Sequence, residues 1–210
     1  MLKACFSIML KQTLFFLIFL VTCSLYAQKG KSKYKYAYFA SGCFWCVEAI
    51  FETVKGVDYA ESGYTGGSIK NPTYEAICTG KTGHAETVKV HYDTTVISYK
   101  ELLRVFFNSH DPSTLNKQGP DSGTQYRSAI FYSNSYEKSL ASEYIKQLKK
   151  DGKFKTITTQ VEQLTTFYKA EAYHQDFEKN NPNNPYVKSV SHPRMDAFKK
   201  KSKEFLKKKG

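Results

Sequence analysis

The sequence predicts an α+β domain in which helices pack on a mixed β-sheet. Its 210 residues are 41% hydrophobic and 15% aromatic, which is enough for one domain with a real core and excludes disorder over the whole chain. Segments whose apolar residues alternate, as in strands, are interspersed with segments of helical periodicity. The two kinds do not alternate strictly along the chain, and this favours a mixed sheet covered by helices.

The domain begins with an aromatic strand and a helix. Residues 33–40 (KYKYAYFA) form the strand, which ends at a turn at Gly42. Apolar residues then recur at i, i+3, i+4 and i+7 from Val47 to Val54, and Gly56 follows as a helix stop. We therefore expect a helix between the two glycines.

Strands and short turns follow up to residue 93. Residues 57–67 predict a strand that enters a glycine turn, and residues 71–80 predict a turn with one helical turn. Residues 84–93 alternate and predict another strand. This stretch therefore supplies two of the strands of the expected sheet.

The second half of the domain begins with a helix at residues 98–110, where Ser98 and Glu101 form a capping box. A polar loop without a periodic pattern follows at residues 111–126, and long loops of this kind are often functional. The remaining expected elements are a strand at 127–132, a helix at 135–153, a strand at 155–164 and a short helix at 168–180.

The first 27 residues are typical of a signal peptide. Lys3 and Lys11 flank the start, and the apolar run at residues 14–21 is short for a membrane span. We expect export to the periplasm or cell envelope, with cleavage after Ala27. A lipoprotein modified at Cys23 is the alternative, and a retained membrane anchor is a third.

The other end of the chain is rich in lysine. The final thirteen residues carry seven lysines and one glutamate, so they hold a large part of the formal net charge of +12. We expect a linker at 28–35, a catalytic domain at 36–193 and a solvated Lys-rich tail at 194–210. An amphipathic helix that touches an anionic membrane surface is the functional alternative, and nucleic acid is not an expected partner.

Three cysteines remain after the leader: Cys43, Cys46 and Cys78. Three are too few for a disulfide framework. Cys43 lies where the first helix begins, and there the helix dipole lowers the pKa of a thiol and makes it a nucleophile, while Cys46 lies one turn further. A zinc site would need a second ligand pair, and a structural disulfide across so short a loop gains little. A thioredoxin-like exchanger remains open, although Phe44 and Trp45 would obstruct a protein substrate.

The strand at residues 84–93 offers a candidate acid. Glu86 shares one strand face with Val88, Val90 and Tyr92. If that face packs on the core, burial raises the pKa of Glu86 and lets it hold a proton near neutral pH. If the strand is turned over, Glu86 is an ordinary solvated residue.

Six motifs in one order are more specific than any one of them. The motifs GCFWC, GYTGG, NPTYE, TGHAE, HDPST and DSGTQYRSAIFY follow one another between residues 42 and 132, within a resemblance that covers residues 36–190. With them the chain resembles the peptide methionine sulfoxide reductases of the A class. The resemblance implies a two-layer fold with a ferredoxin-like core.

The resemblance also implies the chemistry. The cysteine before Phe-Trp, here Cys43, attacks the sulfur of methionine sulfoxide and becomes a sulfenic acid, while the glutamate of GHAE, here Glu86, is the acid. The substrate-binding residues implied by the same motifs are Phe44 and Trp45 around the methyl group, and Tyr74, Asp121 and Tyr126 near the oxygen.

The resemblance implies reduction of the S epimer, free or in proteins, as a means of protein repair. No cysteine follows Cys78, so Cys46 is the expected resolving residue, with a thioredoxin-like protein as reductant and no metal or organic cofactor. Cys78 is expected to be small and buried, and the protein to be a monomer. His84 and His174 are expected to cover or orient the site or to satisfy hydrogen bonds. The alternatives are a general thiol-disulfide oxidoreductase and a basic envelope-binding protein with structural cysteines.

Overall fold

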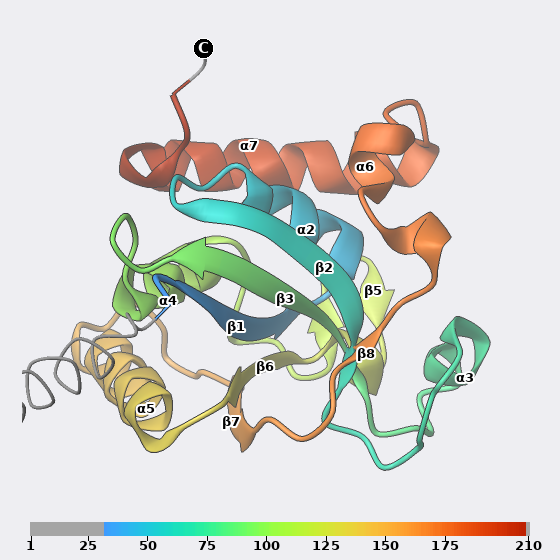
Figure 1. Cartoon of the computed structure of the whole chain (residues 1–210), viewed down its shortest axis with the longest axis horizontal. Coiled ribbons are helices and arrows are strands. Elements are labelled where there is room, and N and C mark those ends of the chain that lie inside the picture. Colours follow the sequence, from blue (N-terminus) through green and yellow to red (C-terminus); the bar gives the residue numbers. More distant parts are fainter. Residues whose placement is uncertain (1–31, 209–210) are drawn as a thin grey trace, which may run out of the picture. The chain divides into compact units, whose positions relative to one another are not determined.

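A six-stranded sheet forms the centre of this computed structural model, which describes residues 32–208 (Figure 1). The strand order is β7-β6-β1-β3-β2-β8, and all neighbours are antiparallel except β6 and β7. The sheet is therefore mixed, as expected. The strands are β1 (Tyr34–Ser41), β2 (Val57–Thr65), β3 (Ala85–Asp93), β6 (Ser128–Tyr132), β7 (Gln160–Gln163) and β8 (Tyr168–Lys169).

The expected ferredoxin-like core is present. Helix α2 (Phe44–Glu52) connects β1 to β2, and helix α4 (Tyr99–Asn108) lies between β3 and β6. Strands β6, β1, β3 and β2 are adjacent in that order, which is the arrangement of a β-α-β-β-α-β unit. Both helices cover the same face, because Phe39 of β1 stacks on Phe51 of α2 at 5.1 Å and on Phe106 of α4 at 5.2 Å.

The strand register explains where the core lies. Phe39 pairs with Val88 on one side and with Ile130 on the other, so these three side chains form one row under the helices. The next row belongs to the opposite face, where Ala40 and Ala129 pair within a smaller apolar cluster. The sheet thus has one heavily packed face, and residues that share the Val88 face are buried.

Local signals set the helix ends. Ser98 caps α4 in a capping box with Glu101, as the sequence predicts. Thr73 caps the short helix α3 (Tyr74–Cys78), and Asn134 caps α5 (Ser135–Lys150). Within the expected loop at 111–126, a small hairpin forms from β4 (Lys117–Gln118) and β5 (Asp121–Ser122). A 3-10 turn, Thr124–Tyr126, completes it.

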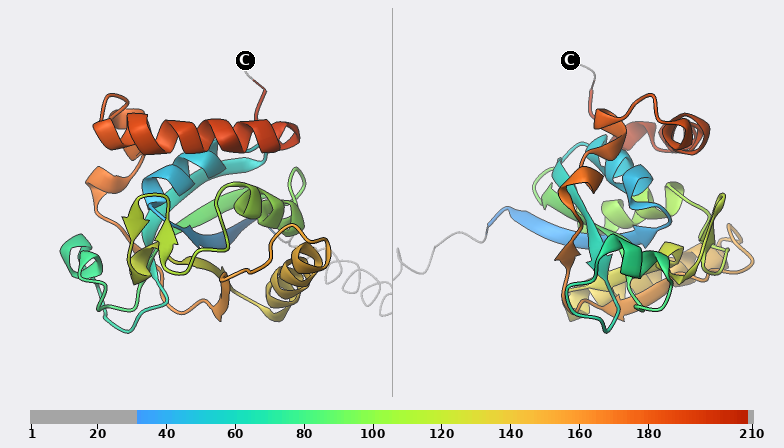
Figure 2. Two further views of the ribbon diagram at one scale, coloured as in Figure 1. Left: turned by 180° about the vertical axis from the view of Figure 1, so that it is seen from behind. Right: turned by 90° about the vertical axis from the view of Figure 1, so that its right-hand side faces the viewer.

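The C-terminal part of the chain is built of short helices. They are a 3-10 turn (Ala172–His174), α6 (Phe177–Asn180), a π-helical turn (Val187–Ser191), α7 (His192–Lys201) and a 3-10 turn (Lys203–Phe205). Figure 2 shows α7 running beside α2. The segment therefore packs on the helix that follows Cys43.

The expected domain boundary at residue 193 does not mark the end of the packed chain. Phe198 and Phe205 are buried, and Leu206 pairs with Val54 in a β-bridge. The apolar residues of this segment anchor it while the lysines between them stay in solvent, so its described part is not a free tail. At the other end, β1 already begins at Tyr34, inside the expected linker.

The predicted leader, with Cys5, Cys23 and the cleavage site after Ala27, lies outside the described residues. Among residues 32–208, no helix has the length and apolar character needed to cross a membrane.

Candidate active site

The two cysteines of GCFWC lie at the start of α2, where the sequence places them. Cys43 is the N-cap residue, and Cys46 lies in the first turn. Both are buried, and their side chains are hydrogen-bonded to each other. The two thiols are therefore neighbours at the start of α2.

The helix dipole alone would favour the thiolate at Cys43, but in this structure the lowered pKa is that of Cys46. Burial and the hydrogen bond to Cys46 raise the pKa of Cys43 well above that of a free thiol, although the N–H of Trp45 lowers it. The hydrogen bond from Cys43 lowers the pKa of Cys46 to about 7, with help from Arg194 and Ser191. The expected lowering at Cys43 is therefore not found in this state, because burial outweighs the helix N-terminus.

Glu86 lies on the buried face of β3, as its alternation predicts. It is 2% exposed and opposes Tyr64 of β2. The N–H of Phe44 donates a hydrogen bond to its Oε2 at 3.0 Å, which joins β3 to the first residue of α2. Burial raises the pKa of Glu86 to about 8. A protonated carboxyl group therefore lies beside the cysteine pair at neutral pH.

An aromatic wall stands next to this carboxyl group. The ring of Trp45 stacks on Phe177 with 3.6 Å between the ring centroids. Its indole N–H donates to Nδ1 of His174 at 3.0 Å, so His174 carries its own proton on Nε2. Phe44 and Tyr74 pack against His174 at 4.9 and 4.4 Å. The wall is thus fixed by both stacking and a hydrogen bond.

The expected polar residues gather around Glu86. Burial raises the pKa of Tyr74 and of Tyr126, and the charge of Glu86 adds to both shifts. Both phenols are therefore hydrogen-bond donors over the whole physiological pH range. The charge of Asp121 raises the pKa of Tyr126 and of Glu86. Its carboxylate accepts a hydrogen bond of 2.5 Å from the hydroxyl of Tyr186. The structure thus brings all of these residues together.

Cys78 differs from its expectation. It was expected to be buried, but it is exposed at the last position of α3. A helix of one turn buries only Ile77, so its neighbours remain at the surface. Cys78 is hydrogen-bonded to Tyr74, and its accessible thiol is therefore close to the site.

The sequence did not single out two residues that hold the site together. Glu171 accepts hydrogen bonds from the hydroxyl of Tyr64 at 2.8 Å and from the N–H of Tyr74 at 2.9 Å. Tyr186 orients Asp121 and lies edge-on to Trp45. Both come from the irregular C-terminal part, where no periodicity marks a buried face. Their only sequence signal is the placement of polar and aromatic residues in a long segment with little regular structure.

A scan against protein families matches residues 35–206 to the peptide methionine sulfoxide reductase family. A relative from Pasteurella multocida, named peptide methionine sulfoxide reductase MsrA, is 50% identical over 81% of this chain and 98% of its own length. The chain belongs to the peptide methionine sulfoxide reductase family. The MsrA of Picrophilus torridus is 45% identical over 78% of this chain and 93% of its own length.

Solved reductases share the fold. The reduced form of Mxr1 from Saccharomyces cerevisiae superposes with a TM-score of 0.69 at 33% identity, over 73% of this chain and 88% of its own. Methionine sulfoxide reductase A of Corynebacterium diphtheriae gives 0.65 at 35% identity, over 74% and 78%. Mxr1 in complex with Trx2 gives 0.50 at 23% identity, over 71% of this chain and 91% of its own, which shows the fold alone.

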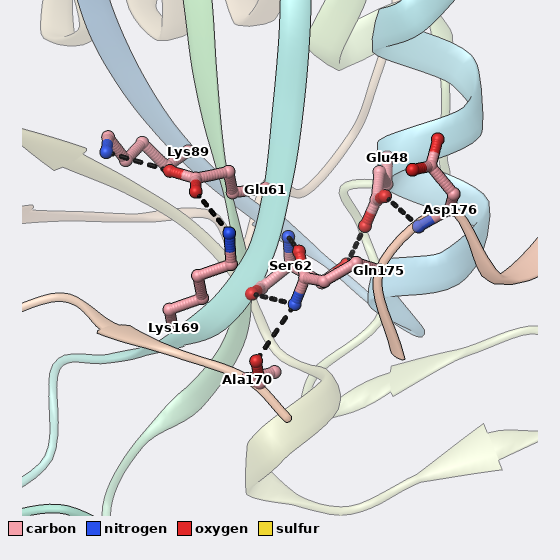
Figure 3. A network of polar contacts seen from close by, with 8 residues as sticks. All are labelled: Glu48, Glu61, Ser62, Lys89, Lys169, Ala170, Gln175 and Asp176. Atoms are coloured by element: carbon pink, nitrogen blue, oxygen red, sulfur yellow. Dashed lines mark hydrogen bonds and ion pairs between the residues drawn. The ribbon is translucent and has the colours of Figure 1, made fainter. Parts of the chain in front are cut away.

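In this reductase, a polar network fixes α2 to the rest of the site (Figure 3). Glu48 accepts hydrogen bonds from the hydroxyl of Ser62 and from the N–H of Asp176, the latter at 2.6 Å. The amide of Gln175 in turn bonds the backbone of Ser62 and the carbonyl of Ala170. Because Phe177 follows Asp176 in the chain, these bonds also hold the Phe177 ring against Trp45.

The same network contains a cluster of acids. Carboxylate oxygens of Glu48, Glu52 and Asp176 lie within 4.8 Å of one another. Both oxygens of Glu48 already accept hydrogen bonds from Ser62 and Asp176. This cluster of the reductase is therefore a structural joint between α2, β2 and the C-terminal segment.

Proposed function

We propose that this reductase acts on the S epimer of methionine sulfoxide, free or in proteins, with Cys43 as nucleophile and Glu86 as acid. The observation that carries the proposal is the buried Glu86 carboxyl, bonded to the first N–H of the helix that Cys43 caps. Its pKa of about 8 keeps it protonated at neutral pH, and a sulfoxide oxygen must gain a proton before it can leave its sulfur.

The first half-reaction transfers the oxygen to the enzyme. Cys46, whose pKa is about 7, takes the proton of the Cys43 thiol through their hydrogen bond. The Cys43 thiolate attacks the sulfoxide sulfur while Glu86 protonates the oxygen. The S–O bond to methionine then breaks as the hydroxyl passes to Cys43, which leaves methionine, a sulfenic acid on Cys43 and a carboxylate at Glu86.

The substrate groups match the surroundings of Cys43. The methyl group of the sulfoxide packs against the rings of Phe44 and Trp45, and Tyr74 and Tyr126 donate hydrogen bonds to the oxygen. Donors placed where negative charge develops stabilise the transition state. Asp121, held by Tyr186, completes the polar side of the pocket. This division of apolar and polar walls is the basis for selecting one epimer.

The second half-reaction regenerates the thiol. Cys46 attacks the sulfenic acid to form a Cys43–Cys46 disulfide, and a thioredoxin-like protein reduces it. Contact between the two cysteines supports this assignment, and no cysteine follows Cys78 in the sequence. The cycle uses no metal or organic cofactor. All the residues that it needs belong to one chain, so the protein works as a monomer.

Single-turnover stoichiometry tests the proposal. Residues 28–210 are incubated with racemic methionine sulfoxide and dithiothreitol, and we expect only the S epimer to be consumed. The Cys46→Ser variant should release one equivalent of methionine and stop as a sulfenic acid when thioredoxin is the reductant. Consumption of the R epimer contradicts the epimer assignment, and full thioredoxin-driven turnover of the variant assigns resolution to Cys78.

Glu86→Gln separates sulfoxide reduction from general disulfide exchange. The amide keeps an oxygen to accept the Phe44 N–H but cannot donate an acidic proton. We expect sulfoxide reduction to fall by about 10²-fold to 10³-fold, within the range for a lost general acid. A disulfide oxidoreductase would keep its insulin-reducing activity in this variant, so parallel assays distinguish the two functions.

Export completes the proposal, with the leader removed after Ala27 and the protein repairing oxidised chains in the periplasm or envelope. The lysines of α7 and the residues after it face an anionic membrane surface there. N-terminal sequencing of the protein recovered from its native compartment checks the cleavage site. An N-terminus at a lipid-modified Cys23 would show that the protein is a lipoprotein and that cleavage does not occur after Ala27.

A further inference from the structure

Cys46 has a second hydrogen-bond partner besides Cys43. The Oγ atom of Ser191 lies 2.9 Å from the Cys46 sulfur, and both residues are about 1% exposed. Ser191 is the last residue of the π-helical turn Val187–Ser191, and 145 positions separate it from Cys46. This contact is one of those that lower the pKa of Cys46.

A buried carboxyl group adjoins the same pair. Glu178 of α6 is hydrogen-bonded to Ser191 and to Cys46, and these bonds lower its pKa, while burial, the larger effect, raises it. Its Oε1 atom is buried and has no hydrogen-bond partner among the described residues. A thiol, a hydroxyl and a carboxyl group from three separate segments thus meet at one point.

We infer that Ser191 and Glu178 form a proton relay that removes the proton of Cys46 when Cys46 resolves the sulfenic acid on Cys43. The inference rests on the proposed resolving role of Cys46. Ser191 touches the reacting sulfur, and Glu178 acts through it and by its own contact with the thiol. The unpartnered oxygen of Glu178 supplies the vacant acceptor.

The second half-reaction requires that the Cys46 thiol lose its proton. Cys46 ends the first half-reaction as a thiol, because it has accepted the proton of Cys43. During resolution the Cys46 S–H bond breaks, an S–S bond to Cys43 forms, and the S–O bond of the sulfenic acid breaks. The sulfur of Cys46 is oxidised and that of Cys43 is reduced. The proton moves through Ser191 to Glu178 and then joins the leaving hydroxide as water.

Electrostatics alone would give Glu178 the opposite effect. Its negative charge raises the pKa of Cys46, whereas Arg194 lowers it. A Glu178→Gln variant that removed only this charge would have more Cys46 thiolate and would resolve faster. A variant that lost a proton acceptor would resolve more slowly. The sign of the change therefore distinguishes the relay from a simple field effect.

Other titratable groups face the relay and bear on its pH dependence. They are Cys43 and Arg194 at Cys46, Glu86 and Tyr186 at the cysteine pair, and His192 and Arg194 at Glu178. Glu178 can accept the proton of Cys46 only while its carboxyl group is deprotonated. The rate of disulfide formation should therefore rise with pH as Glu178 loses its proton, and in Glu178→Gln only the rise that follows ionisation of Cys46 itself should remain.

The test measures the two half-reactions separately in single turnovers of the full chain. Methionine release reports the first, and the loss of the dimedone-reactive sulfenic acid reports the second. In Glu178→Gln we expect disulfide formation to slow by about 10²-fold at pH 7, the lower end of the range for a general base, and methionine release to change far less. Ser191→Ala should slow disulfide formation more than it slows methionine release.

Glu143→Gln is the matched control, because Glu143 accepts a hydrogen bond of 2.7 Å from Ser139 on the exposed side of α5. It should change neither step. Disulfide formation that is unchanged or faster in Glu178→Gln would overturn the relay, and so would an equal slowing of both steps. If Cys46 is not the resolving residue, the Cys46→Ser variant will still form a disulfide. This result is separate from failure of the relay, because Glu178→Gln and Ser191→Ala both keep Cys46.

Discussion

Cys43 and Glu86 hold protons at neutral pH because the fold buries them. Desolvation is the largest cause of both raised pKa values. Alternation along residues 84–93 was sufficient to predict the face of Glu86, since a strand places every second residue on one side. The proton distribution between Cys43 and Cys46 was not predictable, because it depends on their mutual hydrogen bond and their burial, and in smaller part on Arg194 and Ser191 from the far end of the chain.

The pH dependence of methionine release tests the acid at the residue scale. Glu86 is the acid only while protonated, and its pKa is raised from 4.5 to about 8. We therefore expect the single-turnover rate to fall as the pH rises above 8, by about tenfold per pH unit once most carboxyl groups are ionised. Rapid-quench measurement of methionine between pH 6 and 10 checks this.

The control for this profile is Glu86→Gln, whose low residual rate should lack the same alkaline decline. A wild-type rate that stays constant through pH 9 would contradict the assignment of Glu86 as the acid. A decline of equal size in both proteins would assign it to another group.

Helix α2 depends on contacts that its own sequence does not announce. Its apolar spacing predicts the helix and its buried face, but Glu48 of this helix is 2% exposed. Ser62 of β2 and Asp176 before α6 supply the hydrogen bonds that permit this burial. Burial also raises the pKa of Glu48 to about 7. A charged residue in a helix sequence suggests an exposed position, and only the neighbouring elements reverse that expectation.

Glu48→Ala tests this joint at the element scale. The substitution leaves the hydroxyl of Ser62 and the N–H of Asp176 without their acceptor, and we expect the free energy of unfolding to fall by about 2–4 kcal/mol. Movement of Asp176 would also loosen Phe177 against Trp45, so KM should rise more than kcat falls. Urea denaturation and steady-state kinetics measure the two effects.

An exposed glutamate on another helix provides the comparison, and Glu143→Ala should leave both quantities close to wild type. If Glu48→Ala unfolds at the wild-type urea concentration, the network of Figure 3 does not stabilise the fold. A stability loss with an unchanged KM would limit the network to a structural role.

On the scale of the whole molecule, the C-terminal segment closes the structure around the site. Arg194 of α7 donates hydrogen bonds to the carbonyl of Ser109 after α4 and to the carbonyl of Ser41, two residues before Cys43. Phe205 lies further along and is 2% exposed. The backbone of Lys55 bonds the carbonyl of Phe205 at 2.8 Å. The last described residues therefore belong to the fold that holds Cys43.

Phe205→Ala tests this role. Removing a fully buried phenylalanine side chain should lower the free energy of unfolding by about 3–5 kcal/mol. Thermal and urea denaturation measure the loss. Phe205→Leu should recover most of it, and Lys203→Ala on the same turn should have little effect. A stability of Phe205→Ala equal to wild type would mean that the segment is a solvated tail after all.

The sequence by itself determined the α+β class, the main strands and helices up to residue 164, the capping box of α4 and the motifs of the family. These depend on the spacing of residues that are near each other in the chain, and such signals are local. The expected helix at 168–180 was wrong in part, because Tyr168–Lys169 forms strand β8 on β2 and only Phe177–Asn180 is α-helical. Only the tertiary structure decided that Cys78 is exposed, that the lysine-rich end is packed and that Ser191 meets Cys46. Burial and electrostatic contacts between distant segments set these properties, and no local pattern records which segments the folded chain brings together.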